Sequence, residues 1–231
     1  MIEIRKSQAR GKSKTNWLSS LHTFSFGEYY DPHFMNFGKL RVINEDTVQP
    51  GFGFGKHPHN DMEIISYVIT GSLAHRDSMG NGSSIKPGEI QIMSAGTGIE
   101  HSESNHLNNE LLHFLQIWII PEKVDLTPRY QQITIQRTDN EWVLIGSPHK
   151  HETAITIHQD VNLYAAYLTK AHSLDYSFKE NRMGWLQLIK GKIKLNTHEL
   201  TDGDGAAIHN ENFHIECTED AELLFFDLNK E

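Results

Sequence analysis

The chain has 231 residues and a formal net charge of −9, and hydrophobic residues make up 38% of it. This is enough for one large domain or two smaller ones of about 100 residues. The negative charge argues against direct binding to nucleic acid, which depends on clustered cations. No apolar run approaches the roughly 18 residues that cross a bilayer, so we expect no membrane partner.

The cysteine content points to a reducing compartment. Cys217 is the single cysteine, so no disulfide can form within the chain, and we expect a cytoplasmic location. The segment Met1 to Arg10 carries charges and lacks the apolar stretch of a signal peptide. We expect Cys217 itself to be a small buried residue in a strand.

Short strand-like runs recur along the chain, separated by turn signals, and helical periodicity is nearly absent. In the first half these runs are 39–44, 63–69, 72–77, 90–93, 99–104 and 112–119. In the second half they are 132–135, 143–145, 155–158, 162–167, 173–178, 185–189, 192–195, 205–208, 213–217 and 222–227. Many short strands at this spacing predict an all-β sandwich, jelly roll or barrel.

Two passages follow the same pattern of strand, glycine turn, strand and loop. Residues 67–73 are followed by Pro87-Gly88-Glu89-Ile90, and residues 188–193 are followed by a similar glycine–acid step at 202–207. This predicts a duplicated β-barrel joined between Pro121 and Glu141. We therefore expect an N-terminal domain at 1–130 with a metal site and a C-terminal domain at 131–231 without metal ligands.

His57-Pro58-His59 and His101-Ser102-Glu103 are the residues most suited to chemistry. Residues i and i+2 of a strand share a face, so each pair can direct two ligands the same way. Glycine-rich sequence precedes both pairs and allows close approach of the backbone. Fifteen histidines make chance pairs more frequent, so the spacing and the flanking residues carry the interpretation. At the equivalent place in the second half, residues 181–184 contain no histidine.

The ligand set determines which ions are expected. Three imidazoles and a carboxylate suit Fe(II), Mn(II), Ni(II), Cu(II) or Zn(II). An octahedral shell with four protein ligands leaves two positions open, which is typical of a catalytic rather than a structural site.

The two pairs and their flanks resemble known motifs. Residues 51–63, which contain His57, His59 and Glu63, resemble the first cupin motif, and residues 101–105 resemble the second. The segments 22–26, 40–44, 57–63 and 94–103 together resemble the bacterial branch of the pirin family. Gly96 replaces the proline of the second cupin motif, as in pirins. The resemblance implies a bicupin: two tandem double-stranded β-helix (cupin jelly-roll) barrels with one metal in the N-terminal barrel.

The fourth ligand has two candidates. Glu63 is the ligand in most cupins, whereas in pirins the glutamate of the second motif, here Glu103, takes that role. The sequence permits either, and we favour Glu103 because it shares a strand face with His101. Glu63 would then support the site or begin a strand.

The resemblance also implies an activity. It points to an oxidoreductase similar to quercetin 2,3-dioxygenase, which opens a flat, flavonol-like substrate with O₂, with Fe(II) as the preferred ion and Glu103 as the catalytic base. The pocket-lining candidates are Phe52, Phe54, Met93, Phe114 and Trp118. One alternative is a regulatory protein that uses its metal for redox sensing or for contact with a protein partner. Another is an enzyme acting on an unknown small molecule. His22 lies in a segment that resembles the family, and the resemblance gives it no mechanistic role.

Overall fold

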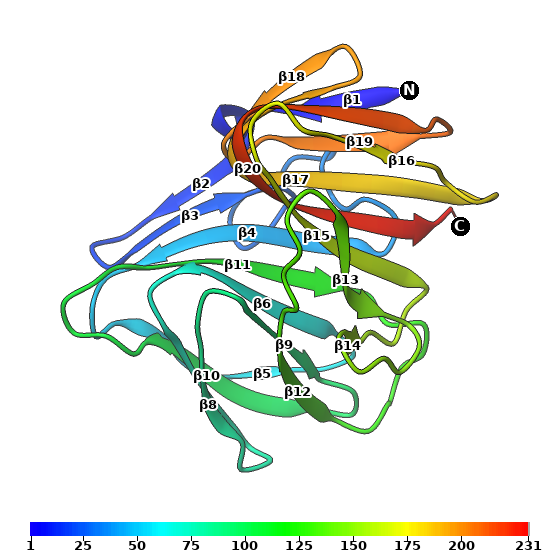
Figure 1. The fold of residues 1–231 in the computed structure, drawn as a ribbon. Helices are drawn as coiled ribbons and strands as arrows, with labels where there is room; N and C mark the ends of the chain where they lie inside the picture. Colours follow the sequence, from blue (N-terminus) through cyan, green and yellow to red (C-terminus); the bar gives the residue numbers. More distant parts are fainter. Residues whose placement is uncertain (231) are drawn as a thin grey trace.

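The computed structural model describes residues 1–230 and shows a chain built from strands. Apart from one 3₁₀ turn at Ser7–Ala9, no helix occurs among these residues, and none of the described part could cross a membrane as a helix. Figure 1 shows two strand-built bodies, one above the other, with both chain termini at the same end of the upper body. The all-β prediction is confirmed.

Two sheets face each other in the N-terminal half. The larger has the strand order β12 (Arg129–Thr134), β9 (Glu89–Ser94), β6 (Glu63–Thr70), β11 (Leu112–Ile119), β4 (Leu40–Val48), β3 (Leu18–His22) and β2 (Gly11–Lys14). The smaller has the order β5 (Gly53–His59), β10 (Ile99–Asn105), β7 (Leu73–Asp77) and β8 (Gly82–Ile85). A buried cluster that includes Val48, Leu73 and Phe114 draws on strands of both sheets.

The C-terminal half forms one nine-stranded sheet. Its main path is β1 (Ile2–Arg5), β19 (Gly205–His209), β17 (Arg182–Leu195), β20 (Phe213–Asn229), β15 (Val161–Leu168), β13 (Trp142–Ser147) and β14 (Ile155–Thr156). β16 (Ser173–Tyr176) pairs with β20, and β18 (His198–Thr201) pairs with β17. Its interior is filled by apolar side chains such as Leu188, Ile193 and Phe225, and Cys217 is buried among them.

The turn predicted at Lys190-Gly191 is wrong. β17 continues through it and pairs with β20, so the predicted strands 185–189 and 192–195 are one element. Gly191 has a φ of +94° at a register shift, which is a β-bulge rather than a chain reversal. A Cβ there would lie 2.1 Å from the carbonyl oxygen of Asp220, so the bulge depends on glycine.

The two halves share a hydrophobic core. Ile43, Leu115 and Ile117 from the N-terminal sheet belong to the same buried cluster as Trp185 and Phe226 from the C-terminal sheet. The Tyr67 hydroxyl adds a polar link, since it donates to Glu222 Oε1 at 2.6 Å. The core and this hydrogen bond hold the two bodies against each other through the strands at their contact.

The division at residues 130 and 131 stays a prediction. Two strands bear on where the halves begin and end. β1 lies at the edge of the C-terminal sheet and pairs with β19, although it begins the chain. β12 pairs with β9 in the N-terminal half and extends to Thr134.

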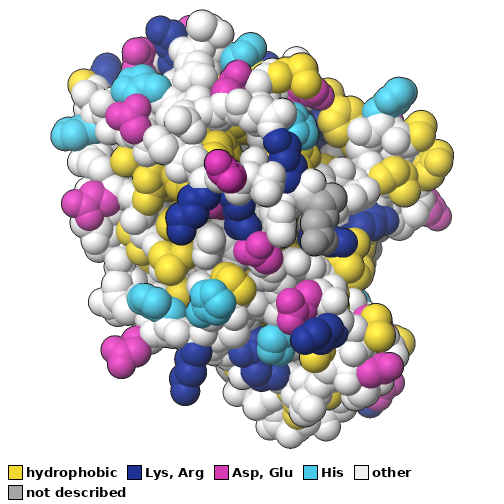
Figure 2. All heavy atoms as spheres, turned by 90° about the vertical axis from the view of Figure 1, so that its right-hand side faces the viewer, with side chains coloured by type: hydrophobic (Ala, Val, Ile, Leu, Met, Phe, Trp, Pro, Cys, Tyr) yellow, Lys and Arg dark blue, Asp and Glu magenta, His cyan; other side chains and the backbone are white. Residues whose placement is uncertain are grey.

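Figure 2 shows one face of the molecule with its charges. Basic and acidic side chains are interspersed there, so neither charge forms a continuous surface on that face.

Candidate metal centre

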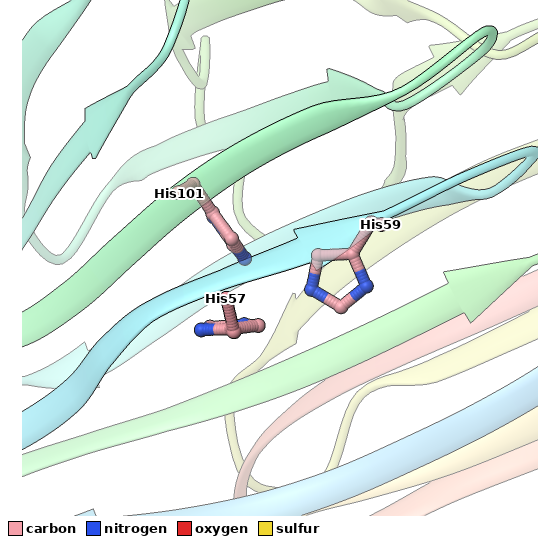
Figure 3. A group of neighbouring side chains, drawn as sticks. All are labelled: His57, His59 and His101. Atoms are coloured by element: carbon pink, nitrogen blue, oxygen red, sulfur yellow. The ribbon is translucent and has the colours of Figure 1, made fainter.

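β5 and β10 bring the two motifs together. They pair antiparallel, with His101 directly opposite His57 and Ile99 opposite His59. The ring centroids lie 4.5 Å apart for His57 and His101, 4.8 Å for His57 and His59, and 4.9 Å for His59 and His101. Figure 3 shows the three imidazoles gathered beside these two strands. One nitrogen from each ring lies within 4.8 Å of the others, close enough to share one ion.

The orientation of His57 is fixed by its own strand. Its Nδ1 lies 2.7 Å from the carbonyl oxygen of Gly55, and a carbonyl can only accept, so Nδ1 carries the proton. This leaves Nε2 as the ring nitrogen that can bind a metal. This is a common way for a protein to select the tautomer of a metal-binding histidine.

His101 provides the test of whether a metal fits. The side chain is only 1% exposed, and neither ring nitrogen has a hydrogen-bond partner among the described residues. Burying an unpaired polar group is unfavourable. A bound ion would give one of the two His101 nitrogens a partner. The donor set also suits the group, because neutral imidazoles bind borderline divalent ions. The residues present therefore fit a divalent transition metal.

Two of the three histidines, His59 and His101, are held in the neutral form that binds metal. Burial lowers the pKa of His59 to about 4, and the nearby His57 acts in the same direction. Burial also lowers the pKa of His101 to about 2, with further contributions from His57, His59 and His75. Metal binding at neutral pH thus needs no proton to be displaced from either His59 or His101.

Glu103 lies beside His101, outside the group formed by the three histidines. It follows His101 on the same buried face of β10, but the register shifts between them, and Glu103 pairs with Phe54 of β5. Its carboxylate lies within 4.8 Å of ligand atoms of His101 and His75, and is not in the group formed by His57, His59 and His101. The structure therefore brings three of the four predicted ligands together and places the fourth beside His101.

The Glu103 carboxylate is buried and hydrogen-bonded at both oxygens. Ser66 Oγ donates to Oε1 at 3.1 Å, and Gln116 Nε2 donates to Oε2 at 2.8 Å. Burial raises the pKa of Glu103 to about 7; the Ser66 hydrogen bond opposes this shift, and the charge of Asp46 adds to it. Glu103 therefore changes protonation near neutral pH, which is the range useful for a general base.

Glu63 lies elsewhere. Its side chain is buried at the start of β6, where Oε2 accepts from Ser94 Oγ at 3.0 Å and from the backbone N–H of His158 at 3.0 Å. No metal-ligand group among the described residues includes it. Its bond to His158 ties the N-terminal half to the C-terminal half, which is a structural role.

A cavity of about 70 Å³ adjoins the histidines. It is bordered by Phe26, Asn44, Asp46, Phe54, His57, His59, Glu103, Gln116 and Trp118. Two of the five predicted pocket residues, Phe54 and Trp118, border it. The other three do not: Phe52 is 50% exposed, while Met93 and Phe114 are fully buried in core clusters.

The sequence reasoning missed four of these bordering residues: Phe26, Asn44, Asp46 and Gln116. Asn44 and Asp46 alternate on β4, so they share a face, and polar residues at alternate positions of a buried strand were an available signal. Asn44 also gives His22 a place in the structure. The His22 Nδ1 lies 2.8 Å from Asn44 Oδ1, so His22 holds a residue of the cavity wall.

Comparisons with known proteins agree with the fold. Residues 3–119 match the family Pirin, and residues 144–228 match the family described as the quercetinase C-terminal cupin domain. The chain is 45% identical over 229 residues to a protein of Escherichia coli named quercetin 2,3-dioxygenase, with 99% of each chain covered. It is 37% identical over 231 residues to a pirin-like protein of Caulobacter vibrioides, covering 98% of this chain and 99% of the other.

Among solved structures, the bacterial pirin YhhW of Escherichia coli in complex with nickel(II) has a TM-score of 0.96. It is 44% identical, with 100% of both chains covered. The fold and the site define a protein with two cupin domains and, in the first, a cluster of histidines that fits one divalent metal. The chain belongs to the pirin family.

Proposed function

We propose that this chain is a metal-dependent dioxygenase that opens the ring of a flavonol with O₂. His57, His59, His101 and Glu103 would hold the metal. The observation that carries the proposal is the buried His101 ring, which has two unpaired nitrogens and forms a triangle with His57 and His59, the two histidines that border the cavity. The similarity to a protein named quercetin 2,3-dioxygenase supports the choice of reaction.

We propose Fe(II) as the ion, with Mn(II), Ni(II), Cu(II) and Zn(II) as alternatives for the same donors. The nickel(II) complex of a similar pirin supports a divalent ion and leaves its identity in this chain open. When bound, the metal would supply a Lewis acid and a template for substrate oxygen.

Glu103 would act on the proton of the substrate. As a carboxylate that binds the metal, Glu103 would be ionised and could accept a proton from a flavonol hydroxyl. Ser66 and Gln116 hold the carboxylate in place through its two oxygens, so little reorganisation accompanies the transfer. Burial keeps bulk water away from the same atoms.

The aromatic border of the cavity fits a flat substrate. Trp118 packs edge-on against His59 at 5.0 Å and against Phe26 at 5.3 Å. The cavity of about 70 Å³ is far smaller than the roughly 300–1,000 Å³ of pockets that enclose drug-sized ligands. Only the reacting edge of a flavonol would enter it, and the remaining rings would lie against Phe54 and Phe26.

Oxygen uptake with quercetin tests this proposal. We expect about one metal per chain by elemental analysis, and turnover that falls at least about 100-fold in His59→Ala, because one imidazole ligand is lost. His106→Ala, at an exposed histidine outside the cluster, is the matched control and should keep full activity.

Turnover that survives His59→Ala would rule out the metal mechanism. A fully metal-loaded protein without turnover would instead favour the regulatory alternative, in which the metal serves redox sensing or contact with a protein partner. We also propose a cytoplasmic location, which the single, buried Cys217 supports.

A further inference from the structure

A bound ion accounts for only one of the two nitrogens of His101. The ring is 1% exposed, and neither nitrogen has a hydrogen-bond partner among the described residues. A neutral imidazole has one nitrogen with a lone pair and one with a proton, so an ion that takes the lone pair leaves the N–H buried and unpaired. Histidines that bind metals almost always donate this N–H to a neighbouring group. The His101 N–H therefore needs an acceptor inside the barrel.

His75 lies beside His101 on the neighbouring strand. β7 pairs with β10, so that His75 lies opposite Glu103 and Asp77 lies opposite His101. The His75 ring is fully buried, and its centroid lies 5.3 Å from that of His101. One nitrogen of each ring lies within 4.8 Å of the other. His75 Nδ1 is also buried without a partner in the part of the chain that the structure describes. Two adjacent rings thus hold three unpaired nitrogens.

Asp77 determines which nitrogen of His75 carries the proton. His75 Nε2 lies 3.3 Å from Asp77 Oδ2. The backbone N–H groups of Met79 and Asn81 donate to Asp77 Oδ1, and Asn81 Nδ2 donates to Oδ2. A carboxylate that receives these donors is ionised and can only accept, so Nε2 carries the His75 proton. The unpaired His75 Nδ1 therefore has the lone pair and is an acceptor.

Two other acceptors lie near His101, and each has another role. Asp77 already receives donors from His75, Met79 and Asn81 that together fill the roughly four lone-pair sites of a carboxylate. Glu103 lies within 4.8 Å of His101, but it binds the metal in the proposed function. His75 Nδ1 has neither commitment, which makes it the acceptor that suits the His101 N–H.

We propose that the pair Asp77–His75 positions His101 for the metal: the His101 N–H donates to His75 Nδ1, and the other His101 nitrogen binds the ion. One ion and one hydrogen bond then satisfy all three unpaired nitrogens of the two rings. The structure shows no hydrogen bond between the rings, so His101 turns slightly to form it. His75 is a positioning residue and not a ligand. The inference rests on the metal site of the proposed function and is independent of the reaction.

This line of contacts gives β7 a part in metal affinity, although β7 supplies no ligand. The charge of Asp77 polarises His75 and makes its Nδ1 a stronger acceptor, and the His101 nitrogen that binds the ion becomes more basic in turn. The hydrogen bond also fixes the plane of the His101 ring. Losing an outer contact of this kind typically costs about 10–100-fold in metal affinity.

Nitrogen NMR of the zinc-loaded protein with isotope-labelled histidine tests the hydrogen bond directly, since zinc(II) is diamagnetic. A hydrogen bond between two imidazoles produces a scalar coupling between the two nitrogens that share the proton. We expect this coupling between His101 and His75 Nδ1, with slow exchange of the His101 N–H with solvent. His57 is the internal control, because its Nδ1–H donates to the carbonyl oxygen of Gly55 and should show no such coupling.

Variants of His75 test the effect on affinity by calorimetry with nickel(II). His75→Phe removes the acceptor and keeps a ring against Tyr130, whose centroid lies 5.0 Å from that of His75. Its affinity should fall by about 10–100-fold. His75→Asn should keep most of the affinity, because its amide oxygen can take the place of Nδ1. His113→Phe is the matched control: His113 binds Glu45 Oε1 at 2.9 Å outside the cluster, so this change should lower stability and leave the affinity unchanged.

A folded His75→Phe protein that binds nickel(II) as tightly as the wild type would overturn the inference, as would a zinc-loaded wild type without the coupling. X-ray absorption that counts four imidazoles on the ion in the wild type and three in His75→Asn would make His75 a ligand and would also overturn it. Where His75→Phe fails to fold, the coupling in the wild type decides. A wild type that binds neither ion would refute the metal site and the inference together, whereas metal binding without the coupling refutes the inference alone.

Discussion

Protonation at single residues controls when the site can bind a metal. Burial moves the pKa of the histidines and that of the carboxylate in opposite directions, because each loses the hydration of its charged form. His59 and His101 consequently stay neutral above about pH 5, whereas Glu103 keeps its proton up to about pH 7. Of these three groups, Glu103 alone exchanges a proton with the incoming metal between pH 5 and 7.

This gives a prediction for the pH dependence of nickel(II) affinity. Metal binds the ionised Glu103, so protons compete with it below pH 7 and stop competing above it. The contribution of Glu103 should therefore raise the nickel(II) affinity by up to about tenfold per pH unit as the pH approaches 7. Above pH 7 this contribution should level off. Calorimetric titrations at several pH values measure it. Glu103→Gln should bind more weakly with a slope smaller by one proton, and equal slopes would contradict the assignment.

At the scale of elements, the close pairing of β5 and β10 builds the site. Gly53 of β5 faces the backbone of β10: a Cβ on it would lie 2.3 Å from the carbonyl oxygen of Glu103 and 2.4 Å from Ser104 Cα. Backbone atoms cannot move aside as a flexible side chain can. The glycine therefore sets the distance between the strands that carry the ligands.

Alanine substitutions within β5 test this dependence. Gly53→Ala should lower the free energy of unfolding by about 1–3 kcal/mol or more and reduce nickel binding, because the strands must separate. Gly55→Ala is the matched control, since a Cβ there has no neighbour within 4 Å. Denaturant unfolding and nickel titration report both effects. If Gly53→Ala behaved like Gly55→Ala, the strand spacing would not depend on Gly53.

Short-range patterns predicted some of these elements and missed others. Alternation on β10 was readable, because Ile99, His101, Glu103 and Asn105 are all buried on one face. The strand β5 is absent from the predicted strand runs, because its pairing depends on close contact with β10 that no local propensity reports. The Gly191 bulge could not be told from a turn, because glycine at positive φ occurs in turns and bulges alike.

The cavity wall depended on contacts that are distant in the sequence. Asp46 and Glu103 border the same cavity but are 57 positions apart in the sequence. Phe26 reaches the cavity from the segment after β3. The ligands could be predicted because each pair lies within three residues, whereas the wall required the register of β4 against β11.

At the scale of the whole molecule, the C-terminal half supports the half that carries the site. Its barrel is filled with apolar side chains, and side chains of β15, β17 and β20 complete a core shared with β4, β6 and β11. Polar contacts cross the same boundary: Tyr67 donates to Glu222 and lies 3.0 Å from the Tyr167 hydroxyl.

Removing the Tyr67 hydroxyl tests how far this boundary contributes to stability. Tyr67→Phe leaves Glu222 without its donor and should lower the free energy of unfolding by about 1–3 kcal/mol, with nickel affinity unchanged. Tyr30→Phe, at a side chain that is 72% exposed, should have no measurable effect. Thermal unfolding of the three proteins gives the comparison. A Tyr67→Phe protein as stable as the wild type would show that this link adds nothing.

The most direct test of the account is X-ray absorption at the nickel edge of the nickel-loaded protein. It reports how many imidazoles bind the ion. We predict scattering from three histidines in the wild type and from two in His101→Ala at saturating nickel, with oxygen completing the shell. An ion bound without histidines, or the same number of imidazoles in both proteins, would contradict the site formed by His57, His59, His101 and Glu103.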